Sequence, residues 1–381
     1  MINNTTNKII PIKKLATGDQ LSINVIEIEG KKPGPTCYIQ ASVHGAEIQG
    51  NLVIYELLET LKKTPINGKF IIVPNANPYA TIQKSGPYTQ GRFNPVTGNN
   101  YNRNYTDIFQ NSEGSAVLEK FLATNTEDHG LKEKYKKLIQ SEVDRLIESK
   151  RRYGLSDDFY LNIQLQKLAA NADICLDLHT GPVACEYLYS NHSQKQEVIN
   201  DFPFEFVLSI PEEFAGAMDE AFFINYTRLN KLLKESNRAQ ISCSSYTVEL
   251  GSEELIDSKI AANFTNKILY FLHKKEMIST LENEIRPQNN ETKYIDLSNY
   301  KTYYAPTGGH VEYIASPGEK IKKGERLAVI YSPNKKESAF DQISVNAIED
   351  CWVINYQNSS TVHEGMELYQ VGENAETISF K

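Results

Sequence analysis

The sequence lacks the features that direct a chain into or across a membrane. Its first residues, MINNTTNKIIPIKKLATGDQ, contain no apolar core and no small-residue cleavage motif. Nowhere do about 18 apolar residues follow one another, as a membrane-spanning helix requires. We therefore expect a soluble, cytoplasmic protein.

Cysteine is sparse and shows no pairing pattern. The chain has five cysteines without a CxxC spacing. At least three lie in apolar segments, where a reduced thiol behaves as a small hydrophobic side chain. This distribution is typical of a reducing compartment. The residues are Cys37, Cys175, Cys185, Cys243 and Cys351.

Positive charge is neither in excess nor clustered. Lys and Arg number 40 against 48 Asp and Glu, a formal charge of −8, and no basic block occurs. Nucleic acid and membrane surfaces are therefore poor partners. The 381 residues are long for one core, so we expect two or three domains.

What is present is an alternation of short apolar segments and helical patterns. Four segments bounded by Gly, Pro or Asn predict buried strands: 36–44, 68–78, 173–179 and 246–251. Helical spacing of apolar residues follows in 46–63, 161–171 and 258–275. This order favours an α/β fold with a mixed sheet flanked by helices. Residues 79–109 predict a long functional loop, and 111–153 a solvated helical insertion.

From about residue 295 the pattern changes to short strands and turns. A weak repeat appears there at a spacing of 41 residues, which predicts a small all-β domain built from two related halves. The matched pairs are Val311 and Trp352, Ile321 and Val362, Gly324 and Gly365, Leu327 and Leu368, and Ile330 and Val371.

Two histidines and a glutamate stand at expected strand ends. His44 and Glu47 are three residues apart in ASVHGAEIQG, at the end of one strand and in the first turn of the next helix, and His179 ends DICLDLH. Zinc prefers such ligands, and sites in open α/β sheets lie beyond the carboxyl ends of strands. Asp177 points the same way as His179 and could orient its ring. Alternatively, these are ordinary buried polar residues and turn caps.

Other polar residues could complete such a site. Glu249 ends the apolar segment YTVELG and could act as a general base, or it could cap the helix that follows. The loop offers Arg92 and the neighbours Asn102 and Arg103, which suit a carboxylate, although single arginines are usually surface charges.

Taken together, these motifs resemble a known family. HGAE, NPYA, the NR of NNYNRNY, DLHTG and TVELG occur in the order found in the zinc carboxypeptidase superfamily, and are most similar to its succinylglutamate desuccinylase/aspartoacylase branch. The resemblance covers roughly residues 35–375. It implies a zinc-carboxypeptidase-like fold over residues 1–290 and one zinc ion per chain.

The resemblance also implies roles for individual residues. It assigns zinc binding to His44, Glu47 and His179, the general base to Glu249, oxyanion stabilisation to Arg92, and substrate binding to Asn102, Arg103 and Arg238. The segment from Arg92 to Asn102 is longer than in aspartoacylase, and the spacing from Arg238 to Glu249 differs by one residue.

The C-terminal domain, 295–375, is similar to the barrel-sandwich hybrid of biotinyl and lipoyl domains. Such domains carry their cofactor on a lysine at a hairpin tip, where this chain has SAFDQISVNA, without lysine. We expect a carrier-like fold that serves as a lid, a spacer or an oligomer contact.

The favoured hypothesis is a zinc-dependent amidohydrolase that deacylates an N-acyl amino acid or similar small carboxylate. One alternative is a metallocarboxypeptidase for short peptides, in which Tyr246 could contact the substrate. Another is a non-catalytic metal-binding or scaffold protein. Asp219 and Glu220 could bind a cationic group of the substrate, or could simply complement a helix N-terminus. A homo-oligomer is possible.

Overall fold

The computed structural model describes residues 3–279 and 291–379. These residues form two compact units. The first contains 3–179, 212–247 and 256–279, and the second contains 180–211, 248–255 and 291–379. The domain boundary expected at residue 290 lies outside the described residues. The second unit takes in the earlier stretches because, for example, strand β10 pairs in parallel with strand β12.

The first unit is built on a mixed sheet, as expected from the sequence. Its strands follow the order β1-β2-β4-β3-β7-β11. Strands β1 and β2 form an antiparallel hairpin, whereas β3 is parallel to both β4 and β7. The bounds are β1 Asn4–Lys14, β2 Gln20–Glu29, β3 Lys32–Ala41, β4 Asn67–Val73, β5 Lys84–Ser85, β6 Tyr88–Thr89, β7 Ile174–Gly181 and β11 Ser244–Ser252, where β7 and β11 continue past the ranges of this unit.

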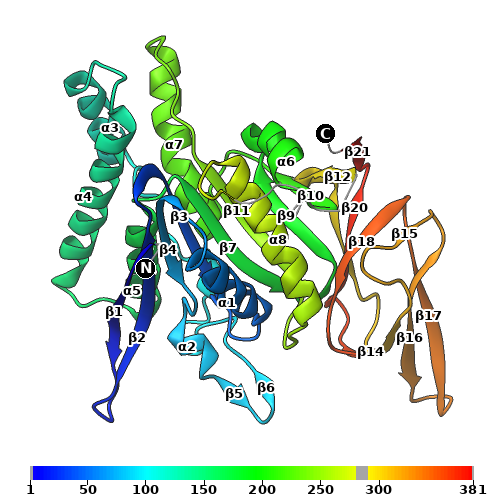
Figure 1. The fold of residues 1–381 in the computed structure, drawn as a ribbon. Coiled ribbons are helices and arrows are strands. Elements are labelled where there is room, and N and C mark those ends of the chain that lie inside the picture. The colour runs from blue at the N-terminus through cyan, green and yellow to red at the C-terminus, as the bar shows by residue number, and fades with distance from the viewer. Residues whose placement is uncertain (1–2, 280–290, 380–381) are drawn as a thin grey trace. The chain divides into compact units, whose positions relative to one another are not determined.

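Helices cover both faces of this sheet (Figure 1). On one face α1 lies beside α8, and Gly50 of α1 fits closely against Ala41 and Leu178. On the other face α4, α5 and α7 share a hydrophobic core with strand residues such as Tyr38 and Cys175. The helices are α1 Gln49–Leu61, α2 Pro78–Thr81, η1 Tyr101–Arg103, α3 Ser112–Thr124, α4 Leu131–Arg151, α5 Asp157–Ala169, α7 Met218–Glu235 and α8 Ser258–Lys274.

Two details differ from the sequence-based expectation. Strand β3 ends at Ala41 and α1 begins at Gln49, so His44 and Glu47 lie in the connection rather than at a strand end and in a helical turn. The 111–153 segment does form two helices, α3 and α4, but α4 buries one face through Tyr135, Ile139 and Val143. This segment is therefore part of the core of its unit.

The second unit is rich in strands. Strand β10 runs parallel to β9 and β12, and β12 is antiparallel to β21. Two further sheets have the orders β13-β20-β18-β15, with β8 beside β18, and β17-β16-β14-β19. The bounds are β8 Val183–Ala184, β9 Glu186–Asn191, η2 His192–Gln194, α6 Lys195–Asp201, β10 Phe206–Ile210, β12 Glu291–Asp296, η3 Leu297–Asn299, β13 Tyr300–Tyr304, β14 Gly309–Tyr313, β15 Lys320–Ile321, β16 Arg326–Asn334, β17 Ala339–Asn346, β18 Cys351–Tyr356, β19 Thr361–Val362, β20 Glu367–Glu373 and β21 Glu376–Ser379.

The repeat of 41 residues is visible in these strands. The series β13 to β16 corresponds to β17 to β20, and exchanging equivalent strands converts the order β13-β20-β18-β15 into β17-β16-β14-β19. Gly324 and Gly365, which are matched by the repeat, both have left-handed backbones with φ of 85° and 82°. Two related halves therefore exchange strands to form the two sheets.

The hairpin between the halves differs from the sequence prediction. Its turn lies between Asn334 and Ala339, so Lys335 and Lys336 occupy the tip and SAFDQISVNA runs along β17. The side chain of Asn334 closes this turn by accepting from the backbone N–H groups of Lys336 and Glu337. The prediction of a hairpin tip without lysine is wrong.

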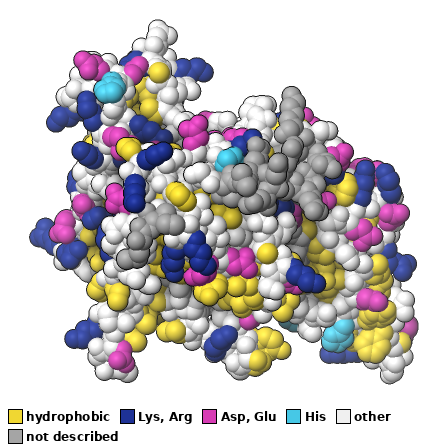
Figure 2. Space-filling model, viewed as in Figure 1, with side chains coloured by type: hydrophobic (Ala, Val, Ile, Leu, Met, Phe, Trp, Pro, Cys, Tyr) yellow, Lys and Arg dark blue, Asp and Glu magenta, His cyan; other side chains and the backbone are white. Residues whose placement is uncertain are grey.

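Other expectations concern the surface and the thiols. No helix among residues 3–279 and 291–379 is long and apolar enough to cross a membrane. On the face drawn in Figure 2, basic side chains are interspersed with acidic ones. All five cysteines are free thiols, and Cys37, Cys175 and Cys351 are buried.

Candidate metal centre

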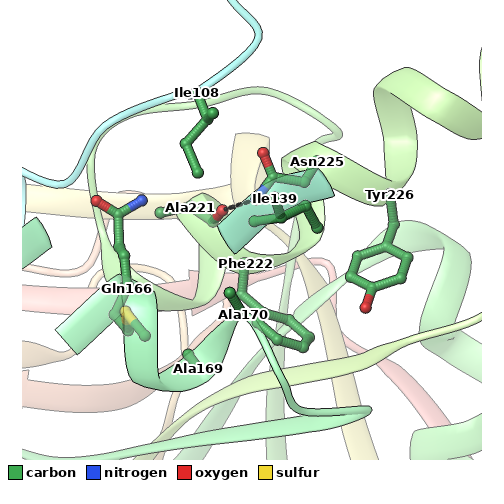
Figure 3. Close-up of a pocket in the computed structure, with 10 residues that line it drawn as sticks. Ile108, Ile139, Gln166, Ala169, Ala170, Ala221, Phe222, Asn225 and Tyr226 are labelled. Carbon is green, nitrogen blue, oxygen red and sulfur yellow. Dashed lines mark hydrogen bonds between the residues drawn. The ribbon is translucent and has the colours of Figure 1, made fainter. Parts of the chain in front are cut away.

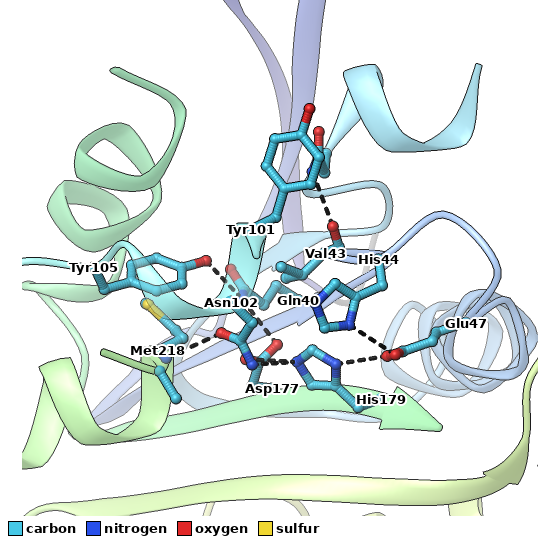
Figure 4. Close-up of polar contacts among 12 residues, drawn as sticks. Gln40, Val43, His44, Glu47, Tyr101, Asn102, Tyr105, Asp177, His179 and Met218 are labelled. Atoms are coloured by element: carbon cyan, nitrogen blue, oxygen red, sulfur yellow. Dashed lines mark hydrogen bonds and ion pairs between the residues drawn. The ribbon is translucent and has the colours of Figure 1, made fainter. Parts of the chain in front are cut away.

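His44, Glu47 and His179 form a buried group in the first unit that could hold a metal ion. One potential ligand atom from each residue lies within 4.8 Å of the other two. Nδ1 of His44 is 2.7 Å from Oε1 of Glu47, and Nδ1 of His179 is 2.6 Å from Oε2 (Figure 4). Two imidazoles and one carboxylate are a donor set that suits zinc.

The far nitrogen of each imidazole has its own partner. Nε2 of His44 lies 2.8 Å from Oδ1 of Asn100, and Nε2 of His179 lies 2.9 Å from Oδ2 of Asp177. When Nε2 of each ring carries the hydrogen, as metal binding through Nδ1 requires, the lone pair of each Nδ1 is available to a metal ion beside Glu47. This arrangement of an acceptor behind each ring is how proteins fix the tautomer of a metal-binding histidine.

Asp177 is held in turn by a buried polar network. Its Oδ1 accepts from Nε2 of Gln40 at 2.8 Å, and the Oε1 of Gln40 accepts from the hydroxyl of Tyr38 at 2.7 Å. The hydroxyl of Tyr105 lies 3.4 Å from the same Gln40 nitrogen (Figure 4). Tyr38, Gln40, Asp177 and His179 occupy alternate positions of paired strands and so point to one face.

The pKa values of the two histidines shift in opposite directions because of burial and nearby charge. Burial lowers the pKa of His44, despite the nearby Glu47 carboxylate. Burial also opposes protonation of His179, but the negative charges of Asp177 and Glu47 raise its pKa well above the usual range. Burial alone would raise the pKa of Glu47. The two histidines outweigh this effect and hold its pKa well below the usual range. The group therefore favours an ionised carboxylate facing cationic charge.

Arg92 lies beside this group. Its Nη1 is 3.0 Å from Oε1 of Glu47. The backbone of the loop is fixed there because the N–H of Gly45 donates to the carbonyl of Gly91, and a Cβ on Gly91 would lie 2.4 Å from the carbonyl oxygen of Ala80. Close backbone approach thus positions Arg92 against the turn that carries His44 and Glu47.

Asn102 contacts the group at His179, and Arg103 follows Asn102 in the chain. Nδ2 of Asn102 lies 3.2 Å from Nε2 of His179, and its Oδ1 accepts from the N–H of Met218 (Figure 4). Arg103 is exposed and donates to the carbonyl of Asn102. Among the described residues no carboxylate pairs with this guanidinium, so it is available to an anionic ligand.

Glu249 lies on β11 and is buried within the second unit. Its negative charge adds to the effect of burial in raising the pKa values of Tyr187 and Tyr300, two buried tyrosines of the same unit. Glu249 is therefore close enough to both tyrosines to interact with them electrostatically.

Arg238 is not brought to the histidines. Met218, at the start of α7, contacts Asn102, whereas Arg238 follows the end of this helix of 18 residues. Such a helix spans about 27 Å. The Arg238 guanidinium instead pairs with Asp128 and donates to the carbonyl of Asn125.

Three further residues have structural roles. Tyr246 is fully buried and packs edge-on against Phe271. Glu220 accepts from the N–H groups of Ala215 and Ala217, and Asp219 is buried. Two alternatives were open for Asp219 and Glu220: complementing the N-terminus of α7 or binding a substrate cation. The contacts fit the first alternative better.

The apolar cavity in Figure 3 is too small for a substrate. It has a volume of about 10 Å³ and is lined mainly by side chains of α4, α5 and α7, including Ile139, Ala169 and Phe222. This is roughly the space that one water molecule needs. It is a packing defect of the helical face of the unit.

Sequence reasoning missed Asn100 and Gln40. Asn100 lies 56 positions from His44 in a loop rich in asparagine, and nothing in its local pattern distinguishes it from its neighbours. Gln40 carried a signal, because a polar residue between the apolar Ile39 and Ala41 of a buried strand requires a partner.

Comparison with known proteins identifies relatives. A sequence model of the succinylglutamate desuccinylase/aspartoacylase catalytic domain matches residues 33–136. A protein of this family from Shewanella amazonensis SB2B is 33% identical, with a TM-score of 0.89, over 98% of this chain and 100% of its own. One from Shewanella frigidimarina NCIMB 400 is 32% identical, with a TM-score of 0.90, over 100% and 99%.

More distant solved structures show the same fold. A succinylglutamate desuccinylase from Silicibacter sp. TM1040 is 16% identical with a TM-score of 0.65, over 98% of this chain and 96% of its own. No curated protein sequence matches the chain.

Proposed function

Because the chain belongs to the succinylglutamate desuccinylase/aspartoacylase family, we propose that it is a zinc-dependent hydrolase that removes the acyl group from an N-acyl amino acid or similar small carboxylate. The observation that carries this proposal is the buried group of His44, Glu47 and His179, whose two Nδ1 atoms face one carboxylate.

These residues fit a zinc ion in number and in kind. Two neutral imidazoles and a carboxylate leave a coordination position for water or substrate, as catalytic zinc sites do. The partners of the Nε2 atoms, Asn100 and Asp177, support the same fit because they fix the tautomer that binding requires. A zinc ion in such a site lowers the pKa of a water molecule and polarises a carbonyl.

The chain's own residues supply the remaining steps of the proposal. Glu249 takes a proton from the attacking water and later delivers it to the leaving amine. Arg92 stabilises negative charge on the carbonyl oxygen, which is supported by its position beside Glu47. Arg103, with Asn102, binds the carboxylate of the substrate through its exposed guanidinium.

The two alternatives have less support. A carboxypeptidase that accepts short peptides would use the same residues, but Tyr246 cannot contact a substrate from its buried position. A non-catalytic metal-binding protein would not need an exposed Arg103 that has no carboxylate partner among the described residues and contacts only the carbonyl of Asn102 there. Residues 1–290 remain the proposed hydrolase domain, although their stretches 180–211 and 248–255 belong to the second compact unit. Residues 295–375 remain the proposed β-domain, which serves as a lid, a spacer or an oligomer contact.

The test combines metal analysis with hydrolysis. Plasma mass spectrometry of the purified protein should find about one zinc per chain, as the three-ligand site requires. His179→Ala should lose this zinc and the exposed control His310→Ala should keep it. The wild type should release amine from a panel of N-acyl amino acids, and Glu249→Gln should bind zinc without hydrolysis.

Each contrary result has a definite meaning. Absence of zinc after reconstitution would overturn the metal site. Zinc binding without hydrolysis of any N-acyl amino acid or peptide would favour the non-catalytic alternative. Full activity of Glu249→Gln would remove Glu249 as the base.

A further inference from the structure

An exposed phenylalanine lies in the loop that carries Arg92. Phe93 is 54% exposed although a phenyl ring is costly to leave in water. The segment around it is well fixed. The carbonyl of Arg92 accepts from the N–H of Tyr101, and the N–H of Asn94 donates to the carbonyl of Asn99. The exposure of Phe93 is therefore imposed by ordered backbone.

These two hydrogen bonds define the direction of the side chain. They flank Phe93 and Asn100, which therefore form a non-hydrogen-bonded antiparallel pair. In such pairs the Cα atoms are about 4.5 Å apart and both side chains point to the same face. Because Asn100 uses its side chain to contact Nε2 of His44, the side chain of Phe93 leaves the loop on the same face, toward His44.

The opposite side carries the residues proposed to bind the carboxylate. Asn102 contacts Nε2 of His179, and Arg103 follows it with an exposed guanidinium. An N-acyl amino acid bound through its amide carbonyl extends in two directions, with its carboxylate on one side and its acyl chain on the other. If Arg103 holds the carboxylate, the acyl chain extends toward His44 and Phe93.

The same segment offers little to a charged acyl group. Between residues 90 and 101 the one charged residue is Arg92, and it pairs with Glu47. Nothing else in this segment would neutralise a second carboxylate, as an acidic acyl group requires, whereas a phenyl ring stabilises apolar surface.

We propose that Phe93 forms the acyl-binding wall of the site and that the substrate carries an uncharged, apolar acyl group larger than acetyl. This inference rests on the proposed function and adds the class of acyl group to it. It requires no group transfer beyond the hydrolysis already described.

The test measures kcat/KM of the zinc-loaded protein for the N-acetyl, N-succinyl, N-hexanoyl and N-benzoyl derivatives of one amino acid. This amino acid is the one that is released fastest in a preliminary panel of N-acyl amino acids. The hexanoyl and benzoyl compounds should exceed the acetyl compound by about 10-fold or more, since one methylene in an apolar pocket is worth about 10-fold. Phe93→Ser should lower the hexanoyl-to-acetyl ratio by about 10-fold, and Phe93→Leu should restore most of it.

A matched control lies in the same loop. Val96 is 84% exposed in the turn closed by Asn94, and Val96→Ser should leave the ratio unchanged. A second readout does not depend on turnover. Isothermal titration of the zinc-loaded protein with hexanoate and acetate should show tighter binding of hexanoate in the wild type and not in Phe93→Ser.

The outcomes separate this inference from the proposed function. Hydrolysis of N-acyl amino acids with equal or better rates for acetyl or succinyl would overturn the inference and leave the deacylase intact. A ratio unaffected by Phe93→Ser, or changed equally by Val96→Ser, would also overturn it. No hydrolysis of any compound would refute the proposed function itself.

Discussion

Oδ2 of Asp177 lies 2.9 Å from Nε2 of His179, while Nδ1 of the same ring faces Glu47. The carboxylate thus fixes the ring from behind, and Gln40 fixes the carboxylate. Asp177 and His179 can form this pair because they are two residues apart in one strand, and such residues point to the same face.

Asp177→Asn should weaken zinc binding by about 10- to 100-fold without unfolding the protein. The amide removes the negative charge that favours Nε2–H on His179, so the ring is less well oriented. Competition with a chromophoric chelator measures the affinity. Excess zinc should restore occupancy, and the exposed control Asp144→Asn should bind zinc as the wild type does. Unchanged affinity in Asp177→Asn would show that the pair does not orient the ligand.

Arg103→Ala should raise KM by about 10- to 100-fold for an N-acyl amino acid and change kcat less. The reason is that an exposed guanidinium binding the distal carboxylate contributes similarly to the ground state and the transition state. Steady-state kinetics with the free acid and with its methyl ester provide the test. The ester should be insensitive to the substitution. Arg151→Ala, on a solvated part of α4, is the control, and equal losses for acid and ester would contradict the role.

Asp219→Asn should stabilise the protein at pH 8 and much less at pH 5. Burial raises the pKa of Asp219 from 3.8 to about 7, with Glu220 and Asp177 adding like charge. The folded state therefore binds a proton that the unfolded state has released, and stability falls as pH rises from about 4 to 7. A shift of this size corresponds to up to about 4 kcal/mol. Urea unfolding at both pH values measures it, and an identical pH dependence in the two proteins would contradict it.

Gly91→Ala should destabilise the protein more than Gly86→Ala. Both glycines have left-handed backbones, with φ of 84° and 60°, so each alanine costs about 1 to 2 kcal/mol in strain. Only at Gly91 does the new Cβ meet backbone, 2.4 Å from the Ala80 carbonyl, which adds about 1 to 3 kcal/mol. Urea unfolding compares the two variants. Because Gly91 supports the turn of His44, its variant should also hold less zinc; equal effects at both positions would argue against this close approach.

Much of the fold followed from the sequence because its signals are local. Continuous apolar strands, the helical pattern of α8 and the repeat of 41 residues depend on neighbours in the chain. The HxxE and DLH segments likewise placed His44, Glu47 and His179 as candidates, and the resemblance to the deacylase family was confirmed by relatives of 32–33% identity. Local patterns did not define the ends of β3 and α1, because the residues between Ala41 and Gln49 form a turn whose contacts are with distant segments such as Gly91 and Asn100.

Contacts between distant segments were decided by the tertiary structure alone. Arg92 reaches Glu47 across 45 positions and Asn100 reaches His44 across 56, whereas Arg238 is carried away by the length of α7. The sequence determined which residues could bind a metal and which strands could present them. Only the packed chain decided which amides and arginines surround them, because burial and close backbone approach depend on the simultaneous positions of segments that the sequence keeps far apart.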